Sequence, residues 1–286
     1  MKIRVEHFEF NCEFANPDPQ LSHDFYRGLF MPTSKKLASG LLLALSLLLL
    51  MPVTAAAVSN TGKRKQRPAK RSVTRAEVKE AERRLAEMGY ATGRIDGVVD
   101  GNTRSALVVF QKWESRKVTG RLTREDFDAI IKADPPQPKD SGYKHVEVDL
   151  DRQVLLLIDD DGRLKKLLPV SSGSNKRYRE KNESGLAYTP RGRFRVEAKI
   201  LGWRKSPLGL LYYPSYFSGG IAIHGNPSVP LSPQSHGCIR IPMSAAIEVS
   251  RELPVGTIVL VYDKQSFVSA KEWVAADKQK QEAKTW

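Results

Sequence analysis

Residues 145–170 read HVEVDLDRQVLLLIDDDGRLKKLLPV, and this stretch indicates the fold class. Hydrophobic and polar residues alternate at first, Val154–Ile158 is a continuous apolar run, and hydrophobic residues return from Leu164 to Val170. Asp159–Gly162 lies between the last two segments and has the composition of a hairpin turn. The pattern predicts successive β-strands, two of them joined by a tight turn.

Further short hydrophobic segments follow the first three, separated by Gly and Pro. We expect strands at residues 194–200, 210–213, 221–223 and 257–262, and a helix only at 244–252. Many short strands between Gly/Pro turns are typical of a sandwich or barrel. The sequence therefore predicts a mostly β domain from Tyr143 to residue 263.

The residues that carry chemistry gather in one stretch, IAIHGNPSVPLSPQSHGCIRIP, residues 221–242. A thiol acts as a nucleophile in its thiolate form, and a neighbouring histidine can take its proton and return it to a leaving group. The candidate residues are His224, Ser235, His236, Cys238 and Arg240. Together they have the composition needed for acyl transfer through a thioester.

The neighbours of Cys238 have roles of their own. Gly237 lets the backbone approach closely, and we expect its N–H to be free to donate toward an oxyanion. Arg240 lies two residues further along a strand, on the same face as the cysteine, where it can hold a carboxylate. Spacing alone does not decide whether His224 or His236 is the base.

Two other interpretations of this cluster remain open. His224, His236 and Cys238 are three N/S ligands, the number that a catalytic zinc uses, but their spacing is not that of a zinc motif. In the second interpretation Cys238 is a buried structural residue, and the histidines only make hydrogen bonds within the fold. His145 is interpreted as a strand or surface residue and not as a ligand.

Here the chain resembles the L,D-transpeptidase catalytic domain. The resemblance rests on His224-Gly225, on SHGCIR at 235–240, on TPRGRF at 189–194 and on GGIAIH at 219–224, and it spans about 120 residues. The loop of 10 residues between His224 and Ser235 is at the short end of that family's range.

The resemblance implies a role for each residue of the motif. Cys238 would be the nucleophile, and His224 the proton donor and acceptor, its tautomer held by the carbonyl of Gly225. His236 would support the thiolate or the oxyanion, Ser235 would position the histidines, and Arg240 would orient the stem peptide. The substrate would be peptidoglycan stem peptides, with no metal or organic cofactor.

A helical pattern occupies residues 74–133. Val78, Ala81, Leu85 and Met88 form one helical face after a Thr74/Glu77 capping box, and Gly89 ends that helix. A second helix is expected after Asn102 or Thr103 as N-cap, and a third from Thr123. This region resembles the peptidoglycan-binding domain in four pieces that occur in the order GY, IDGVVDGNT, FQ and VTGRLT. The resemblance implies binding to wall peptide or glycan.

The N-terminal part reads as an export signal. Lys35 and Lys36 precede the uncharged run 37–51, and Ala55–Ala57 follow it, which is typical of a signal peptide over residues 31–57. An uncleaved membrane anchor is the alternative. Met31 would be a conventional start, which makes residues 1–30 either an over-extended start or a short tail. We expect export to the periplasm or the cell wall.

Composition limits the remaining possibilities. The chain has 286 residues, of which 41% are hydrophobic, a net charge of +14 and two cysteines. The hydrophobic fraction excludes wholesale disorder, and two cysteines are too few for a disulfide-rich scaffold. Seven basic residues lie between 63 and 75 without an acidic one, so the linker 58–73 is predicted to be solvated and to meet an anionic cell envelope instead of nucleic acid.

The predicted order along the chain is therefore an N-terminal region, a helical module and a mostly β catalytic domain with a charged tail. The boundaries are 1–30, 31–57, 58–73, 74–133, a Pro-rich linker 134–142, 143–263 and the tail 264–286. Two alternatives to a transpeptidase share the same residues: a wall-binding protein with an inactive catalytic domain, and an L,D-carboxypeptidase that uses water as acceptor.

Overall fold

The computed structural model describes residues 71–180 and 182–283. The predicted signal segment 31–57, residues 1–30 and most of the basic linker 58–73 lie outside the described residues. Within the described part of the chain, no helix has the length and hydrophobicity to cross a membrane.

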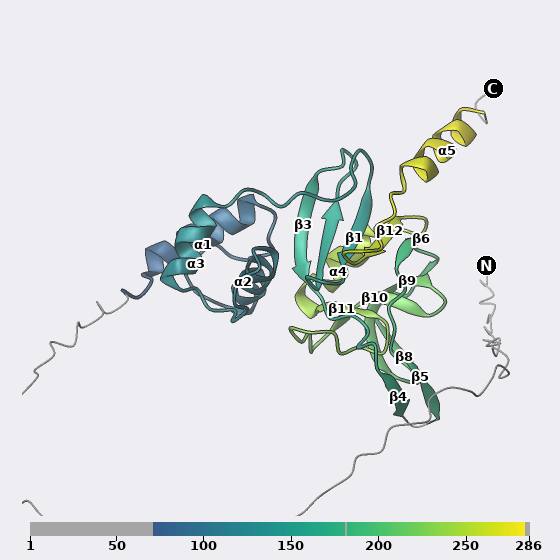
Figure 1. Cartoon of the computed structure of the whole chain (residues 1–286), viewed down its shortest axis with the longest axis horizontal. Helices are drawn as coiled ribbons and strands as arrows, with labels where there is room; N and C mark the ends of the chain where they lie inside the picture. Colours follow the sequence, from purple (N-terminus) through teal and green to yellow (C-terminus); the bar gives the residue numbers. More distant parts are fainter. Residues whose placement is uncertain (1–70, 181, 284–286) are drawn as a thin grey trace, which may run out of the picture. The chain divides into compact units, whose positions relative to one another are not determined.

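The helical module contains three helices, as predicted (Figure 1): α1 (Arg75–Glu87), α2 (Gly101–Trp113) and α3 (Arg124–Lys132). Thr74 caps α1 in a capping box with Glu77, which confirms that prediction, and Thr123 caps α3 in the same way. The predicted cap of α2 was wrong. Asp100 is the N-cap, because its carboxylate accepts the N–H of Thr103 at 2.8 Å and Gly101 already belongs to the helix.

The β-rich domain is built on two main sheets, in agreement with the predicted class (Figure 1). The first has the strand order β3-β2-β1-β12-β6, and the second has the order β11-β10-β9-β7 with β8 paired to β9. The strands of the first sheet are β1 (His145–Asp149), β2 (Val154–Ile158), β3 (Leu164–Pro169), β6 (Gly192–Arg195) and β12 (Ile258–Tyr262). Those of the second are β7 (Ala198–Lys199), β8 (Trp203–Ser206), β9 (Gly209–Ser218), β10 (Ile221–Asn226) and β11 (Ile239–Pro242).

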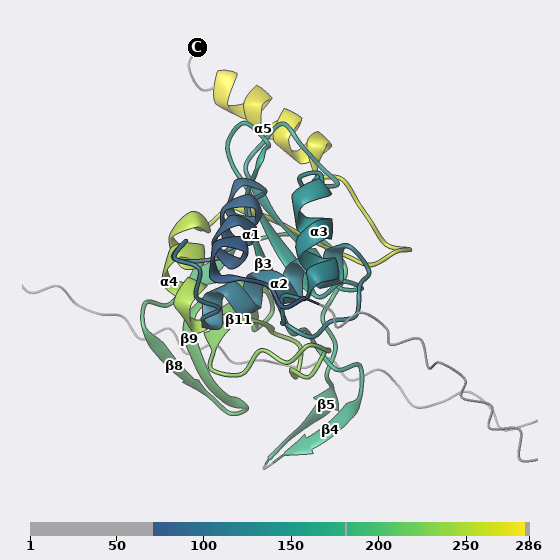
Figure 2. The same ribbon diagram turned by 90° about the vertical axis from the view of Figure 1, so that its left-hand side faces the viewer.

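A two-stranded hairpin was not predicted. It consists of β4 (Arg177–Glu180) and β5 (Glu183–Leu186), which pair with each other and with neither main sheet. In Figure 2 this hairpin extends away from β3, the strand that precedes it. Its residues are mostly polar and exposed, so they lack the buried periodicity by which a strand is recognised in sequence.

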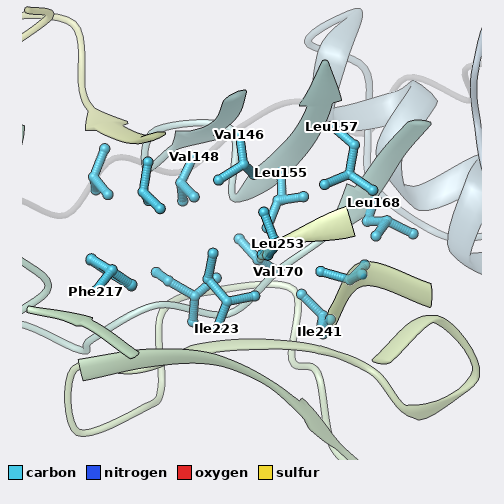
Figure 3. Close-up of a cluster of buried hydrophobic side chains, with 14 of the residues drawn as sticks. Val146, Val148, Leu155, Leu157, Leu168, Val170, Phe217, Ile223, Ile241 and Leu253 are labelled. Atoms are coloured by element: carbon cyan, nitrogen blue, oxygen red, sulfur yellow. The ribbon is translucent and has the colours of Figure 1, made fainter. Parts of the chain in front are cut away.

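The main core lies between the two sheets (Figure 3). Val146, Val148 and Leu155 point from the first sheet toward Phe217 and Ile223 of the second. Helix α4 (Met243–Glu252), predicted at 244–252, adds its buried face to the same cluster.

The opposite face of the first sheet is also covered, by two different segments. Val154, Leu156, Ile158 and Leu167 pack against the helical module in a second core cluster. Ile258 and Leu260 pack against Tyr143, Ala270 and the segment that leads to helix α5 (Lys271–Glu282). Burial on both faces explains why β2 and β12 are apolar without alternation.

Backbone hydrogen bonds also join the helical module to β3. The N–H of Leu167 donates to the carbonyl of Gly89 at 2.8 Å, and the N–H of Ala91 donates to the carbonyl of Leu167 at 3.4 Å. The described residues, 71–180 and 182–283, accordingly belong to one compact unit. The helical module is thus an integral part of the packing of this sheet.

The Pro-rich segment 134–142 is anchored at its end by a buried carboxylate. Glu147 of β1 accepts the N–H groups of Lys139 and Asp140 at 3.0 and 2.7 Å and the hydroxyl of Tyr262 at 2.8 Å. His145 lies in β1 with 1% exposure and contacts the same carboxylate, as the strand interpretation predicted. Residues 139 and 140 are therefore part of the folded domain.

Candidate functional site

Parallel pairing of β10 with β11 brings the two halves of the motif together. Ile223 pairs with Ile239 and His224 with Arg240. Ile223 and Ile239 belong to the core, and because side chains alternate along a strand, His224 and Arg240 lie on the opposite face. Cys238 directly precedes β11, two residues before Arg240.

His224 is held in one tautomer. It is 5% exposed, and its Nδ1 lies 2.9 Å from the carbonyl oxygen of Gly225. A carbonyl oxygen only accepts, so Nδ1 carries the proton and Nε2 is left as the acceptor. Burial lowers the pKa of His224 from 6.5 to about 4, with a smaller lowering from Arg240 and an opposing effect of the Gly225 hydrogen bond. The ring is therefore neutral at neutral pH.

Gly225 matters for its size as well as for its carbonyl. A Cβ at this position would lie 2.6 Å from Cβ of Ala246 and 3.1 Å from Cδ1 of Tyr212. Helix α4 and β9 therefore approach the strand closely beside His224.

Cys238 directly precedes β11 and is half-buried. Its thiol donates to the carbonyl of Gly220 at 3.8 Å. Burial raises the pKa of the Cys238 thiol above its ordinary value, while the backbone of Ala222 and the charge of Arg240 act in the opposite direction. The favoured resting state is thus a neutral thiol at Cys238 and a neutral imidazole at His224.

Two predicted roles near Cys238 need correction. The N–H of Gly237 donates to the hydroxyl of Ser235 at 3.0 Å, so it is not free for an oxyanion. That hydroxyl in turn donates to the carbonyl of Cys238 at 2.6 Å, and Ser235 is 3% exposed. Ser235 therefore holds the backbone of the loop around Cys238, and its hydroxyl is used in hydrogen bonds to Gly237 and Cys238.

Gly237 is required for its conformation. Its φ is +146°, and a Cβ would lie 2.7 Å from Cδ1 of Ile221 and 2.8 Å from the carbonyl oxygen of Tyr188. The hydroxyl of Thr189 donates to the carbonyl of Gly237 at 2.6 Å and accepts the N–H of Gly173 at 2.8 Å. Thr189 belongs to the TPRGRF run, but its function in the loop could not be read from sequence.

His236 faces the β4–β5 hairpin. Its Nε2 lies 3.1 Å from Oε1 of Glu180, and its ring contacts that of Tyr178 edge-on at 4.6 Å between centroids. Sequence reasoning missed both partners, because they lie more than 50 residues away in a polar segment. The structure therefore gives the two histidines different surroundings: His224 is buried beside Gly225, and His236 lies against a surface carboxylate.

The described residues contain no set of side chains arranged to bind a metal ion. Among residues 71–180 and 182–283, no group of three or more His, Cys, Asp or Glu side chains is arranged to hold an ion. The arrangement has the groups for thiol acyl transfer: a half-buried thiol, a neutral imidazole with a free nitrogen, and an arginine on the same face.

Known proteins resemble the chain in both of its folded parts. The L,D-transpeptidase catalytic domain family matches residues 143–261, and the peptidoglycan binding domain family matches residues 74–130. A crystal structure of the L,D-transpeptidase from Xylanimonas cellulosilytica is 36% identical with a TM-score of 0.62, over 68% of this chain and 97% of that chain. No curated protein matches the chain.

Two further structures share less with this chain. An L,D-transpeptidase from Stackebrandtia nassauensis is 23% identical with a TM-score of 0.38, over 65% of this chain and 90% of that one. An L,D-transpeptidase from Mycobacterium smegmatis is 23% identical with a TM-score of 0.34, over 42% of this chain and 58% of that one.

Proposed function

Because the chain belongs to the L,D-transpeptidase family, we propose that it transfers acyl groups between peptidoglycan stem peptides through a thioester on Cys238. The products would be cross-links between third residues of neighbouring stems, or attachment of another amine. The observation that carries this proposal is the His224 tautomer: with Nδ1 bound to the Gly225 carbonyl, Nε2 is left to accept a proton, and the pairing of His224 with Arg240 brings this ring next to the strand that Cys238 directly precedes.

In the first step the thiol attacks the carbonyl carbon between the third residue and the terminal D-alanine of a tetrapeptide stem. Nε2 of His224 takes the thiol proton as the C–S bond forms, and it gives this proton to the amine of D-alanine as the C–N bond breaks. The neutral states of both groups support a general-base route, in which the proton moves as the bond forms.

In the second step an amine attacks the thioester. His224 takes a proton from the attacking amine, the C–S bond breaks, and the proton returns to the sulfur of Cys238. Arg240 lies opposite His224 in the strand pair and is placed to attract a carboxylate of the stem. Water as the acceptor would make the same site an L,D-carboxypeptidase.

The helical module extends the proposal to binding. Its match to a peptidoglycan binding family supports contact with the wall, where the enzyme would meet its substrate after export through the segment 31–57. The basic linker 58–73 would add attraction to the anionic envelope.

The test uses the protein from residue 58 onward, with Cys238→Ala and His224→Gln variants, incubated with a purified tetrapeptide muropeptide. Mass spectrometry should show a dimer that has lost one D-alanine, and a thioester adduct on the intact protein. Both products should be absent with Cys238→Ala. Loss of D-alanine without dimer, in the presence of excess acceptor stem, would replace the proposal by a carboxypeptidase. No mass change, with wall binding retained, would indicate an inactive binding protein.

A further inference from the structure

A cleft on the helical module has no part in the chemistry described above. It lies where the beginnings of α1 and α3 meet the loop before α3, and its volume is about 850 Å³. Small-molecule and peptide sites commonly have volumes of roughly 300–1,000 Å³, so the cleft is large enough for a peptide of a few residues. Val78, Val99 and Leu122 supply its apolar lining.

The polar lining of the cleft is predominantly cationic. Four arginines, at 71, 104, 121 and 124, line it together with a single carboxylate, that of Glu125. Arg124 is occupied in a two-pronged contact with Glu77, at 2.8 and 2.9 Å. The guanidinium groups of Arg104 and Arg121 have no hydrogen-bond or ionic partner among the described residues, and both side chains are exposed.

The cleft borders the beginning of α3 at Thr123, Arg124 and Glu125, and it reaches α1 at Val78. Both helices already carry carboxylates in their first turns, Glu77 in α1 and Glu125 with Asp126 in α3. The free guanidinium groups of Arg104 and Arg121 are therefore the groups left to bind an anion in this apolar-lined hollow.

We propose that this cleft binds an acidic peptide, and specifically the carboxylate-bearing stem of peptidoglycan. This inference rests on the proposed function, because it assigns the wall-binding module a ligand and a place. Carboxylates would pair with Arg104 and Arg121, and small aliphatic side chains of the stem would lie on Val78 and Leu122. Among the described residues that line the cleft none is aromatic, so they offer no flat face on which a sugar ring would stack, and this favours peptide over glycan.

The test measures binding of a soluble tetrapeptide stem to the protein from residue 58 onward, in a Cys238→Ala background so that the probe is not consumed. Amide chemical shifts of Val99 and Gly120 report on the cleft separately from the catalytic domain. Replacing both free arginines, Arg104→Gln with Arg121→Gln, should weaken binding at these amides by about tenfold or more, because hydrogen bonds to charged groups are lost. The control, Arg94→Gln with Lys117→Gln, removes the same charge from exposed positions of the module outside the cleft and should change affinity less than about twofold.

Several results would overturn the proposal. Unchanged shifts at Val99 and Gly120 would do so, as would equal weakening in the control, which would indicate attraction by overall charge alone. A stem peptide with its carboxylates converted to amides should bind as weakly as the double variant does, and equal affinity would contradict the role of charge. Melting temperatures confirm that each variant is folded. Turnover by the parent chain, measured separately, tests the proposed function, so either idea can fail while the other stands.

Discussion

Leu167→Ala tests whether the helical module and the β-rich domain share one core. Leu167 in β3 is fully buried, and its cluster contains Leu85 and Phe110 of the helical module as well as Leu156 of β2. The substitution removes side-chain atoms from the junction of the two parts. The Gly89 and Ala91 hydrogen bonds to its backbone leave little freedom for β3 to move into the space created.

The expected loss of stability follows from this burial. Leucine-to-alanine changes at fully buried sites cost about 2–5 kcal/mol, partly for transfer and partly for the cavity that remains. We expect about 3 kcal/mol for Leu167→Ala. The matched control is Leu201→Ala, since Leu201 is 78% exposed, and its effect should stay within about 0.5 kcal/mol.

The assay is urea unfolding followed by two sets of probes. Trp113 reports on the helical module, and Trp203 and Trp273 report on the β-rich domain and its C-terminal helix, each set in a variant whose other tryptophans are phenylalanine. If the core is shared, the two probe sets give coincident transitions, and Leu167→Ala shifts both to lower urea by the same amount.

A specific result would refute this reasoning. If the helical module unfolds in a separate transition that Leu167→Ala leaves unchanged, the module is tethered to the sheet and the second core cluster does not bind the two parts together. An effect of Leu201→Ala as large as that of Leu167→Ala would also contradict the argument, because burial would then not determine the cost.

Three further predictions concern the site and the buried carboxylate. The pKa of His224 is lowered to about 4 in the folded state, so the unfolded state takes up a proton first as the pH falls from 6.5. The wild type should therefore lose roughly 3 kcal/mol of stability between pH 6.5 and pH 4, and His224→Gln should lose less. Denaturant titration at each pH measures both losses. Gly237→Ala should destabilise by about 1–3 kcal/mol and abolish thioester formation, because its Cβ meets the Tyr188 carbonyl at a positive φ; retention of full acylation would contradict the required geometry. Glu147→Gln should lower the free energy of unfolding by about 1–3 kcal/mol, because an amide cannot accept as many N–H and O–H donors as a carboxylate. Thermal unfolding measures this loss, and a stability equal to that of the wild type would show that the Tyr262 hydroxyl and the linker amides find other partners.

Local sequence patterns predicted most strands of the β-rich domain. Continuous apolar runs such as Val154–Ile158 and the hairpin turn at Asp159–Gly162 depend on neighbouring residues, and the observed β2 and β3 agree with them. The candidate residues His224, Cys238 and Arg240 could be named from the sequence because they are dense in one stretch, and the structure pairs His224 with Arg240 across β10 and β11.

Other features depend on contacts between distant segments. The apolar run of β2 predicts a buried strand but does not say that its second face meets a helical module. Nothing local pairs Glu180 with His236, and nothing in the SHGC motif shows that the Ser235 hydroxyl takes the Gly237 N–H. Such hydrogen bonds are set by the folded loop, which is why the predicted roles of Ser235 and Gly237 were wrong.

The shared core also bears on the order in which the chain folds. Synthesis proceeds from the N-terminus, so α1, α2 and α3 are complete before β2 and β3 exist. Until residues 154–167 follow, the side of the helices that contacts Leu156 and Leu167 has no cover. The helical module therefore reaches its final stability only after the β-strands have been made, and a nascent chain that stops before β3 presents an apolar surface on which a holding chaperone can bind.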